Sequence, residues 1–338
     1  MRLSTSLTYA GDPRAAADEV ASWERAGLDI VWVSEAYGFD APTIMGYLGA
    51  RTERVQIGSS ILPLFSRTPA LLAQTAAGLD AVSGGRAILG LGASGPQVIE
   101  GWHGVPYDRP VARTREIIEI CRAAWRREIL QHDGIYQLPL PGGLGKPLKM
   151  LTHPVRDRIP IYIAALGESN VRLTAALAEG WLPFLYVPEK AADVWGSALS
   201  AGLARRSPDM PPLEVVAGGL LAIGDDVTGL RDLARPLIAL YVGGVGARSR
   251  NFYHDLVARY GYEAEADKIQ ELYLAGRKDE AAAAVPAELL ERTSLVGTAS
   301  YVRDRLQAFA ESGVTVLNVT PVGDSARLLA QVRELMTA

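Results

Sequence analysis

Small residues with few charges among them follow the hydrophobic runs of this sequence. They are Ser34, Glu35 and Asp40; Ser60 and Ile61; Ala93, Ser94 and Gly95; and Gly167, Glu168, Ser169 and Asn170. In a parallel α/β fold the ends of such runs meet at one edge, where ligands bind. A set of this kind is typical of the lining of a cofactor site rather than of a hydrolase centre.

The sequence gives little support for a metal site or for a catalytic nucleophile. The 4 histidines are scattered and never adopt the H-x-x-x-H or H-E-x-x-H spacing of a zinc site. Ser94 lies in Gly92-Ala-Ser-Gly95, which lacks the G-x-S-x-G frame of a serine hydrolase. We therefore expect no metal. Glu35 stands out, because a carboxylate at the end of an apolar run costs free energy unless it is paired or used in chemistry.

The segment Gly90-Leu-Gly92-Ala-Ser-Gly95 has the glycine spacing of a dinucleotide-binding turn. That interpretation requires a helix directly after the glycines and an acidic residue about 20 residues later. Pro96 follows instead, and a helical pattern over 109–127 occupies the later position. Two alternatives stay open: the glycines let a flat ring approach the strand end closely, or they form a tight turn.

Residues 165–170 lead from a hydrophobic run into a helical pattern. Free N–H groups at a helix start, with Ser169 and Asn170 as further donors, suit a phosphate group. Glu168 opposes an anion there unless its side chain points outward. The same residues also fit an ordinary helix start, so both interpretations stay open.

Strand-like and helix-like segments alternate along the chain. The β-branched or apolar runs lie at 3–9, 30–34, 55–61, 87–92, 159–164, 181–186, 213–223 and 314–320. Gly27, Gly180 and Gly313 are expected to end helices before buried strands. Runs that are apolar throughout indicate burial on both faces, as in a parallel sheet. The pattern predicts an α/β fold, a (β/α)8 TIM barrel with insertions, as a single domain over 1–338.

Two segments interrupt the alternation. Residues near 130–158 are rich in proline and glycine, which predicts an irregular insertion. Residues near 226–293 carry helical periodicity without an obvious strand, which predicts a helical insertion before the last strand of the barrel.

Composition excludes several classes of protein. With 34 basic and 38 acidic residues the formal net charge is −4, which opposes a dedicated nucleic-acid binder. A hydrophobic fraction of 49% excludes disorder, and no apolar stretch is long enough to span a membrane. The single Cys and the lack of a secretory signal indicate a cytoplasmic protein. We expect its partner to be a small-molecule substrate.

Three segments, in this order and spacing, resemble a known family. They are Val31-Trp-Val-Ser-Glu-Ala-Tyr-Gly38, Ala50-Arg-Thr-Glu-Arg-Val-Gln-Ile-Gly-Ser59 and Leu79-Asp-Ala-Val-Ser-Gly-Gly-Arg-Ala-Ile-Leu-Gly-Leu-Gly92. The chain resembles the bacterial luciferase-like superfamily, and specifically its coenzyme F420-dependent oxidoreductase branch. Segments 94–104 and 161–167 strengthen the match, which covers most of the chain and is weakest over 226–293.

The resemblance implies a barrel, usually dimeric, that binds a deazaflavin or flavin at the C-terminal ends of its strands. It also implies a non-prolyl cis peptide at Ser60–Ile61, in a bulge that supports the back face of the ring. The cofactor-binding residues it implies are Ser60 and Ile61 at the bulge; Ala93, Ser94 and Gly95 at the ring and its linker; and Gly167, Glu168, Ser169 and Asn170 at the phosphate. Ser34, at the end of the second hydrophobic run, is a further cofactor-binding candidate from its position alone.

The candidate catalytic residues are Glu35 and Asp40, either of which would position the ring or relay a proton. Several F420 enzymes carry an Asp-His pair at the end of the second strand, where this chain has Glu35-Ala36. The sugar-phosphate dehydrogenase activity of one branch is therefore not supported. Arg248 and Arg250 are candidates for binding an anionic tail, or else belong to a solvated surface.

Three functions remain in view. The first is an F420-dependent oxidoreductase, acting as a homodimer, that moves a hydride between the deazaflavin and an organic substrate. The second is an FMN-dependent luciferase-like monooxygenase, and the third is a barrel that binds flavin or deazaflavin without turnover. An acidic protein that binds the anionic F420 tail must gather cations or backbone N–H groups at its mouth.

Overall fold

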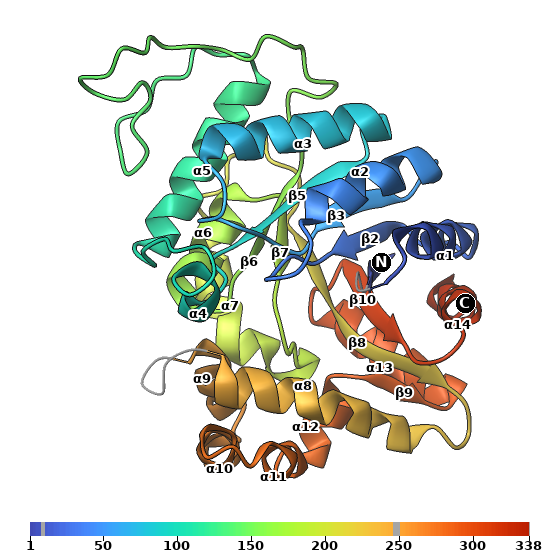
Figure 1. Cartoon of the computed structure of the whole chain (residues 1–338). Helices are drawn as coiled ribbons and strands as arrows, with labels where there is room; N and C mark the ends of the chain where they lie inside the picture. Colours follow the sequence, from blue (N-terminus) through green and yellow to red (C-terminus); the bar gives the residue numbers. More distant parts are fainter. Residues whose placement is uncertain (8–10, 246–250, 338) are drawn as a thin grey trace.

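The computed structural model describes residues 1–7, 11–245 and 251–337, in which parallel strands close into a barrel (Figure 1). The strands are β1 (Arg2–Leu7), β2 (Ile30–Val33), β3 (Gln56–Ser59), β4 (Leu62–Pro63), β5 (Ala87–Gly92), β6 (Ile161–Ala164), β7 (Gly180–Leu182), β8 (Glu214–Ile223), β9 (Leu295–Gly297) and β10 (Val316–Pro321). β10 closes the ring by pairing with both β1 and β8. β3 pairs with the start of β5 and β4 with its end, and β9 lies beside the end of β8. The predicted (β/α)8 TIM barrel is confirmed.

Helices join consecutive strands, except β3 and β4, and cover the outside of the barrel (Figure 1). They are α1 (Pro13–Arg25), α2 (Ala41–Arg51), α3 (Pro69–Ser83), α4 (Pro96–Ile99), α5 (Pro110–Trp125), α6 (Glu168–Leu177), η1 (Pro188–Lys190), α7 (Ala191–Leu203), α13 (Ala299–Glu311) and α14 (Ser325–Thr337). The side chains of Asp12, Asp40 and Thr68 cap α1, α2 and α3, each of which has proline in its first turn.

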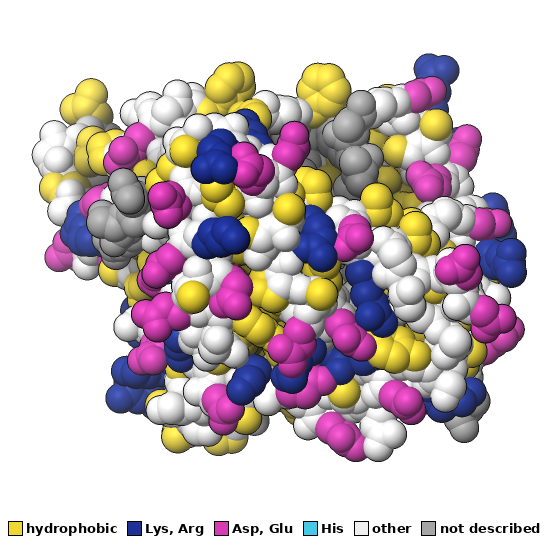
Figure 2. All heavy atoms as spheres, turned by 90° about the horizontal axis from the view of Figure 1, so that it is seen from below, with side chains coloured by type: hydrophobic (Ala, Val, Ile, Leu, Met, Phe, Trp, Pro, Cys, Tyr) yellow, Lys and Arg dark blue, Asp and Glu magenta, His cyan; other side chains and the backbone are white. Residues whose placement is uncertain are grey.

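A block of helices connects β8 to β9 and lies along the lower side of the barrel in Figure 1. It consists of η2 (Thr228–Ala234), α8 (Arg235–Ala239), the π-helix η3 (Leu240–Gly244), α9 (Phe252–Arg259), α10 (Glu263–Leu274), α11 (Lys278–Ala283) and α12 (Ala287–Arg292). Asn251 ties α9 to η3: its Oδ1 accepts from the backbone N–H of Tyr253, and its amide donates to the carbonyl of Val242 at 2.7 Å. Figure 2 shows this side, where basic and acidic side chains are interspersed.

Large side chains fill the barrel interior, and glycines make room for them. Trp32 and Tyr162 are almost fully buried there, with ring centroids 5.5 Å apart. A Cβ on Gly58 would overlap the Trp32 ring, and one on Gly180 would overlap the Tyr162 ring. The expectation that Gly180 ends a helix is therefore wrong: α6 ends at Leu177, and Gly180 begins β7 as a packing residue. Gly27 and Gly313 do have the positive φ expected after helices.

Polar side chains occupy the N-terminal end of the barrel. The guanidinium of Arg2 pairs with Glu214 at 3.2 Å and also donates to Gln56. The hydroxyl of Tyr162 donates to Glu214 from inside the barrel. These residues link β1, β3, β6 and β8, so this end of the barrel serves stability.

Contacts at the same end of the barrel explain the charged residues of segment 79–92. Asp80 is fully buried, pairs with Arg156 and accepts a hydrogen bond from the Ala87 N–H. Arg86 donates to the carbonyls of Gly49, Thr52, Val55 and Ser83. The segment that carries the family resemblance most strongly is therefore built around structural ion-pair and backbone contacts.

The chain between α5 and β6 leaves the barrel as a long loop, drawn in green at the upper left of Figure 1. Its described secondary structure is an isolated bridge between His132 and Leu138. Glu116 on α5 anchors the loop by accepting from the N–H groups of Ile135 and Tyr136 at 3.1 and 3.0 Å. In residues 1–7, 11–245 and 251–337, no helix has the length and hydropathy needed to cross a bilayer.

Candidate functional site

The C-terminal end of β3 carries a bulge with an apolar side chain at its tip. The Ser60–Ile61 peptide is cis, as expected, and the Ser60 N–H donates to the carbonyl of Val33 at 2.7 Å. Ile61 and Ala164 are partly buried and pack on the apolar cluster of the barrel interior. A Cβ on Gly92 would lie 3.0 Å from Ile61 and 3.2 Å from Ala164. Ile61, Gly92 and Ala164 thus form an apolar floor at the strand ends.

The glycines of β5 serve strand packing, so the dinucleotide-binding interpretation is wrong. A Cβ on Gly90 would overlap the backbone carbonyl of Ser59, and the Ser59 hydroxyl bonds to both the carbonyl and the N–H of Gly90 at 2.8 and 2.9 Å. Gly92 admits the side chain of Ile61. The strand is followed by the four-residue helix α4, not by the long helix of a Rossmann unit.

Ala93, Ser94 and Gly95 form the turn after β5 and directly follow Gly92 of this floor. Ala93 is partly buried, and Ser94 is exposed with a φ of 56°, in the left-handed region. Tyr107 donates its hydroxyl to the Ser94 carbonyl at 3.3 Å. Gly95 precedes α4 without a side-chain cap.

The turn after β6 presents backbone donors at the start of α6. Gly167 is the N-cap residue and offers no side-chain cap, whereas the N–H groups of Asn170 and Val171 bond to its carbonyl. The N–H groups of Glu168 and Ser169 therefore lack intrahelical acceptors, as at every helix start. Such donors suit an anionic group.

The orientation of Glu168 leaves this helix start open to an anion. Glu168 points outward, with its side chain 64% exposed and its Oε1 3.7 Å from Arg259. The buried Oδ1 of Asn170 has no hydrogen-bond partner in the described part of the chain, and as an acceptor it suits a donor group of a ligand rather than an anion. The indoles of Trp181 and Trp195 donate to the carbonyls of Ala165 and Leu166 at 2.9 and 3.1 Å, which fixes the turn from behind.

The candidate catalytic acids have structural partners. Glu35 is nearly buried and makes a two-point ion pair with Arg67, with N–O distances of 2.6 and 2.8 Å. Its Oε2 also accepts from the N–H of Ala41 at 2.8 Å. Asp40 is exposed and caps α2 through Thr43. Ser34 is exposed at the end of β2.

Arg67 was not expected from the sequence, although a signal for it exists. A buried carboxylate at one strand end needs a cation from a neighbouring strand end, and Arg67 is the arginine that follows β4. The candidates Arg248 and Arg250 lie outside the described residues, as do positions 8–10 at the end of β1.

The helical block reaches over the strand ends at two points. A Cβ on Gly95 would lie 3.9 Å from Val245, and one on Gly167 would lie 3.6 Å from Phe252. Burial and the neighbouring Tyr37, on the loop after β2, raise the pKa of Tyr241 in η3. Residues on either side of 246–250 therefore adjoin the turns after β2, β5 and β6.

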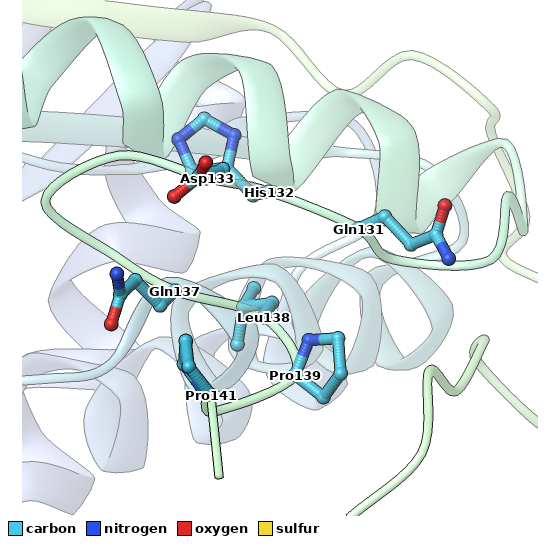
Figure 3. A pocket seen from close by; sticks show the side chains of 7 residues that line it. All are labelled: Gln131, His132, Asp133, Gln137, Leu138, Pro139 and Pro141. Atoms are coloured by element: carbon cyan, nitrogen blue, oxygen red, sulfur yellow. The ribbon is translucent and has the colours of Figure 1, made fainter.

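A hollow elsewhere in the molecule is distinct from this site (Figure 3). It is lined by Gln131, His132, Asp133, Gln137, Leu138, Pro139 and Pro141. All of these belong to the loop between α5 and β6, and none follows a strand of the barrel. The strand ends, where the floor and the donors meet, are the better candidate. No three His, Cys, Asp or Glu side chains gather as a metal site in the part of the chain that the structure describes.

Comparisons with known proteins agree with this arrangement. Residues 1–316 match the family described as luciferase-like monooxygenase. The chain is 42% identical to a putative coenzyme F420-dependent oxidoreductase of Mycobacterium tuberculosis, over 99% of this chain and 98% of that protein. It is 26% identical to a 5,10-methylenetetrahydromethanopterin reductase of Archaeoglobus fulgidus, over 91% and 90% of the two chains. The fold is that of the coenzyme F420 dependent tetrahydromethanopterin reductase from Methanopyrus kandleri, with a TM-score of 0.79 at 22% identity over 99% and 98% of the two chains.

Proposed function

The chain belongs to the luciferase-like monooxygenase family, and on that premise we propose that it is an oxidoreductase that uses coenzyme F420 to move a hydride to or from an organic substrate. The 42% identical mycobacterial relative, whose name specifies F420, supports the choice of cofactor. FMN is the second candidate, because the family takes its name from monooxygenases.

The proposal rests on one observation: an apolar floor and free backbone N–H donors lie at the same end of the barrel, where the strands end. Ile61, Gly92 and Ala164 offer the floor against which a flat ring rests. The start of α6, with Glu168 turned outward, offers donors for the phosphate of the cofactor tail. These residues fit a deazaflavin better than a metal or a free sugar.

When bound, F420 supplies or accepts a hydride, and the protein contributes binding, orientation and exclusion of water. Ile61 would support one face of the ring, while Ser94 and Gly95 would contact the ring and its linker. The Glu35–Arg67 pair holds the loop after β2 against the loop after β4. Val245 and Phe252 would restrict access of water from the side of the helical block.

Calorimetric titration with F420, and separately with FMN, tests the cofactor. We expect F420 to bind with a Kd of about 1 μM or tighter and FMN at least about 10-fold more weakly. Tight FMN binding without a response to F420 would overturn the proposal in favour of an FMN-dependent monooxygenase. Tight F420 binding with no hydride exchange for any candidate substrate would favour a barrel without turnover.

A charge placed at the start of α6 tests the phosphate position. Ser169→Asp adds a negative charge that stabilises the helix by up to about 1 kcal/mol through the helix dipole, and we expect it to weaken F420 binding at least about 10-fold. Ser300→Asp is the matched control, since Ser300 is exposed at the same position of α13, whose start is capped by Thr298. Equal F420 affinity in the two variants would show that the phosphate binds elsewhere.

A further inference from the structure

Three aromatic side chains from distant parts of the sequence gather at the end of β7. Phe184 lies two residues beyond that strand, Tyr241 lies in η3 and Tyr253 lies in α9. The ring centroid of Phe184 is 4.4 Å from that of Tyr241 and 5.5 Å from that of Tyr253, and the two tyrosine rings are 4.7 Å apart. All three side chains are partly buried, so each keeps accessible surface. We call them the Phe184 cluster.

The segments that carry the Phe184 cluster lie near the turns of the proposed cofactor site. Tyr241 is close enough to Tyr37, on the loop after β2, for the two phenols to interact electrostatically. Tyr253 interacts in the same way with Tyr107, whose hydroxyl contacts the carbonyl of Ser94. Val245, four residues after Tyr241, and Phe252, next to Tyr253, reach Gly95 and Gly167. The segments that carry the two tyrosines therefore contact the turns that would hold the ring and the tail.

Two hydroxyl groups in this cluster are available to a ligand. Tyr241 and Tyr253 make no side-chain hydrogen bond within residues 1–7, 11–245 and 251–337. Burial, together with the neighbouring phenols, raises both pKa values, so each hydroxyl keeps its proton at neutral pH and remains a donor. Because each side chain keeps accessible surface, a ligand oxygen can accept from its hydroxyl.

We infer that the Phe184 cluster is the substrate subsite of the proposed oxidoreductase, and that the substrate is a flat, uncharged, conjugated carbonyl compound. The aromatic rings offer stacking surface to a planar molecule. The hydroxyls of Tyr241 and Tyr253 offer hydrogen bonds to its carbonyl oxygen, where negative charge develops when a hydride arrives. This inference rests on the proposed use of F420.

The reaction balances with reduced F420 as the only reductant. A hydride adds to the β-carbon of the conjugated carbonyl compound, the C=C π pair moves to form an enolate, and the cofactor is oxidised by two electrons. A proton, released with the hydride as the cofactor is oxidised, reaches the enolate through solvent. The product is the saturated carbonyl compound.

Calorimetry with two matched ligands tests the subsite on the complex with oxidised F420, in which no turnover occurs. The probes are 4-phenyl-3-buten-2-one and 3-penten-2-one, which differ by a phenyl ring in place of a methyl group. We expect the phenyl compound to bind about 10-fold more tightly, because it alone stacks on the cluster. With reduced F420, it should yield 4-phenyl-2-butanone.

Variants separate the roles of ring and hydroxyl. Phe184→Leu should weaken binding of the phenyl compound about 3- to 10-fold. The affinity for 3-penten-2-one should stay within about 2-fold of the wild-type value. Tyr241→Phe and Tyr253→Phe should each weaken binding of both probes about 2- to 10-fold, because each probe has the carbonyl oxygen that the hydroxyls would bind. Tyr47→Phe on α2 is the matched control and should change neither affinity.

Equal affinity of the two probes, or an unchanged preference in Phe184→Leu, would overturn the inference. F420 affinity is measured first for every variant, which distinguishes failure of cofactor binding from failure of substrate binding. If the wild-type protein does not bind F420, the proposed function is wrong. If F420 binds and the phenyl preference is absent, only the substrate class is wrong.

Discussion

The carboxylate of Glu35 is committed to holding two loops together. Both of its oxygens face the guanidinium of Arg67, and one also accepts from the Ala41 N–H. Arg67 follows β4 and Ala41 begins α2, so the pair connects the loop after β2 to the bulged edge of the site. The geometry favours a positioning role for Glu35, whereas its assignment as a catalytic residue stays a prediction.

Glu35→Gln separates these roles. Loss of the charge leaves Arg67 unpaired in a nearly buried position, so we expect a loss of about 2–4 kcal/mol in the free energy of unfolding and weaker F420 binding. Asp40→Asn is the control, because asparagine caps a helix about as well as aspartate and the change should stay within about 0.5 kcal/mol. Denaturant unfolding and calorimetry measure both. Unchanged stability with a large loss of turnover would instead identify Glu35 as a proton relay.

Glu24 gives the stability of the fold a dependence on pH. Burial alone would raise the pKa of this carboxyl, but hydrogen bonds from the N–H groups of Val55, Arg54 and Glu53 lower it overall from 4.5. Because the folded-state pKa lies below the unfolded value, the stabilisation is fully present above the unfolded pKa. It is lost as the pH falls through the folded pKa.

Glu24→Gln should therefore lower the free energy of unfolding by about 1–3 kcal/mol at neutral pH. It should also make the free energy of unfolding fall less steeply on acidification below about pH 5. Urea unfolding at a series of pH values measures both effects. Glu19→Gln, an exposed position on the same helix, should keep the wild-type profile. Parallel profiles for the wild type and Glu24→Gln would contradict the assignment.

At the scale of elements, local signals determined most of the barrel. Thr68-Pro69 and Gly84-Gly85 bound α3 because capping and positive φ are local properties. β7 is shorter than its apolar run, since Pro183 lacks an N–H for the ladder and Leu185 has a φ of 51°. β9 and α4 are too short to show a period and were not expected.

The candidate site was less accessible to sequence reasoning than the fold. The strand-end rule selected Ser60, Ile61 and the turn at Gly167, because topology fixes where strands end. Arg67 and Phe184 were missed, since their partners are distant in sequence and meet them only after folding. A glycine alone also does not reveal whether it ends a helix or admits a ring, as Gly180 shows.

Gly180→Ala tests that packing role. The added Cβ would overlap the buried Tyr162 ring, so we expect a loss of about 1–3 kcal/mol in the free energy of unfolding. Gly196→Ala is the control of opposite sign: it lies inside α7 with nothing within 4 Å of its Cβ, and should stabilise by about 0.5–1 kcal/mol. Thermal unfolding of the two variants compares them. A neutral or stabilising Gly180→Ala would contradict the packing role.

At the scale of the whole molecule, the loop between α5 and β6 exposes leucines far from the site. Leu140, Leu144, Leu148 and Leu151 each have at least 67% of their surface exposed. Large apolar side chains exposed on one loop are candidates for a contact surface. We propose that a second copy of the chain covers them, in the homodimer that the family resemblance implies.

Leu144→Asp combined with Leu151→Asp should place charges in that contact. We expect the wild type to sediment as a dimer at micromolar concentration and the double variant as a monomer, because an unpaired buried charge opposes association. Leu274→Asp, at a half-exposed leucine on α10, should remain dimeric. A monomeric wild type would contradict the proposal.

The fluorescence of two indoles can report on the turn after β6. Trp181 and Trp195 lie 5.1 Å apart, and their hydrogen bonds end on the carbonyls of Ala165 and Leu166, directly before the helix start. Any ligand that shifts this backbone alters the polarity around both rings, and with it the colour and intensity of their ultraviolet emission. The protein therefore carries a built-in optical reporter of occupancy at one end of its site.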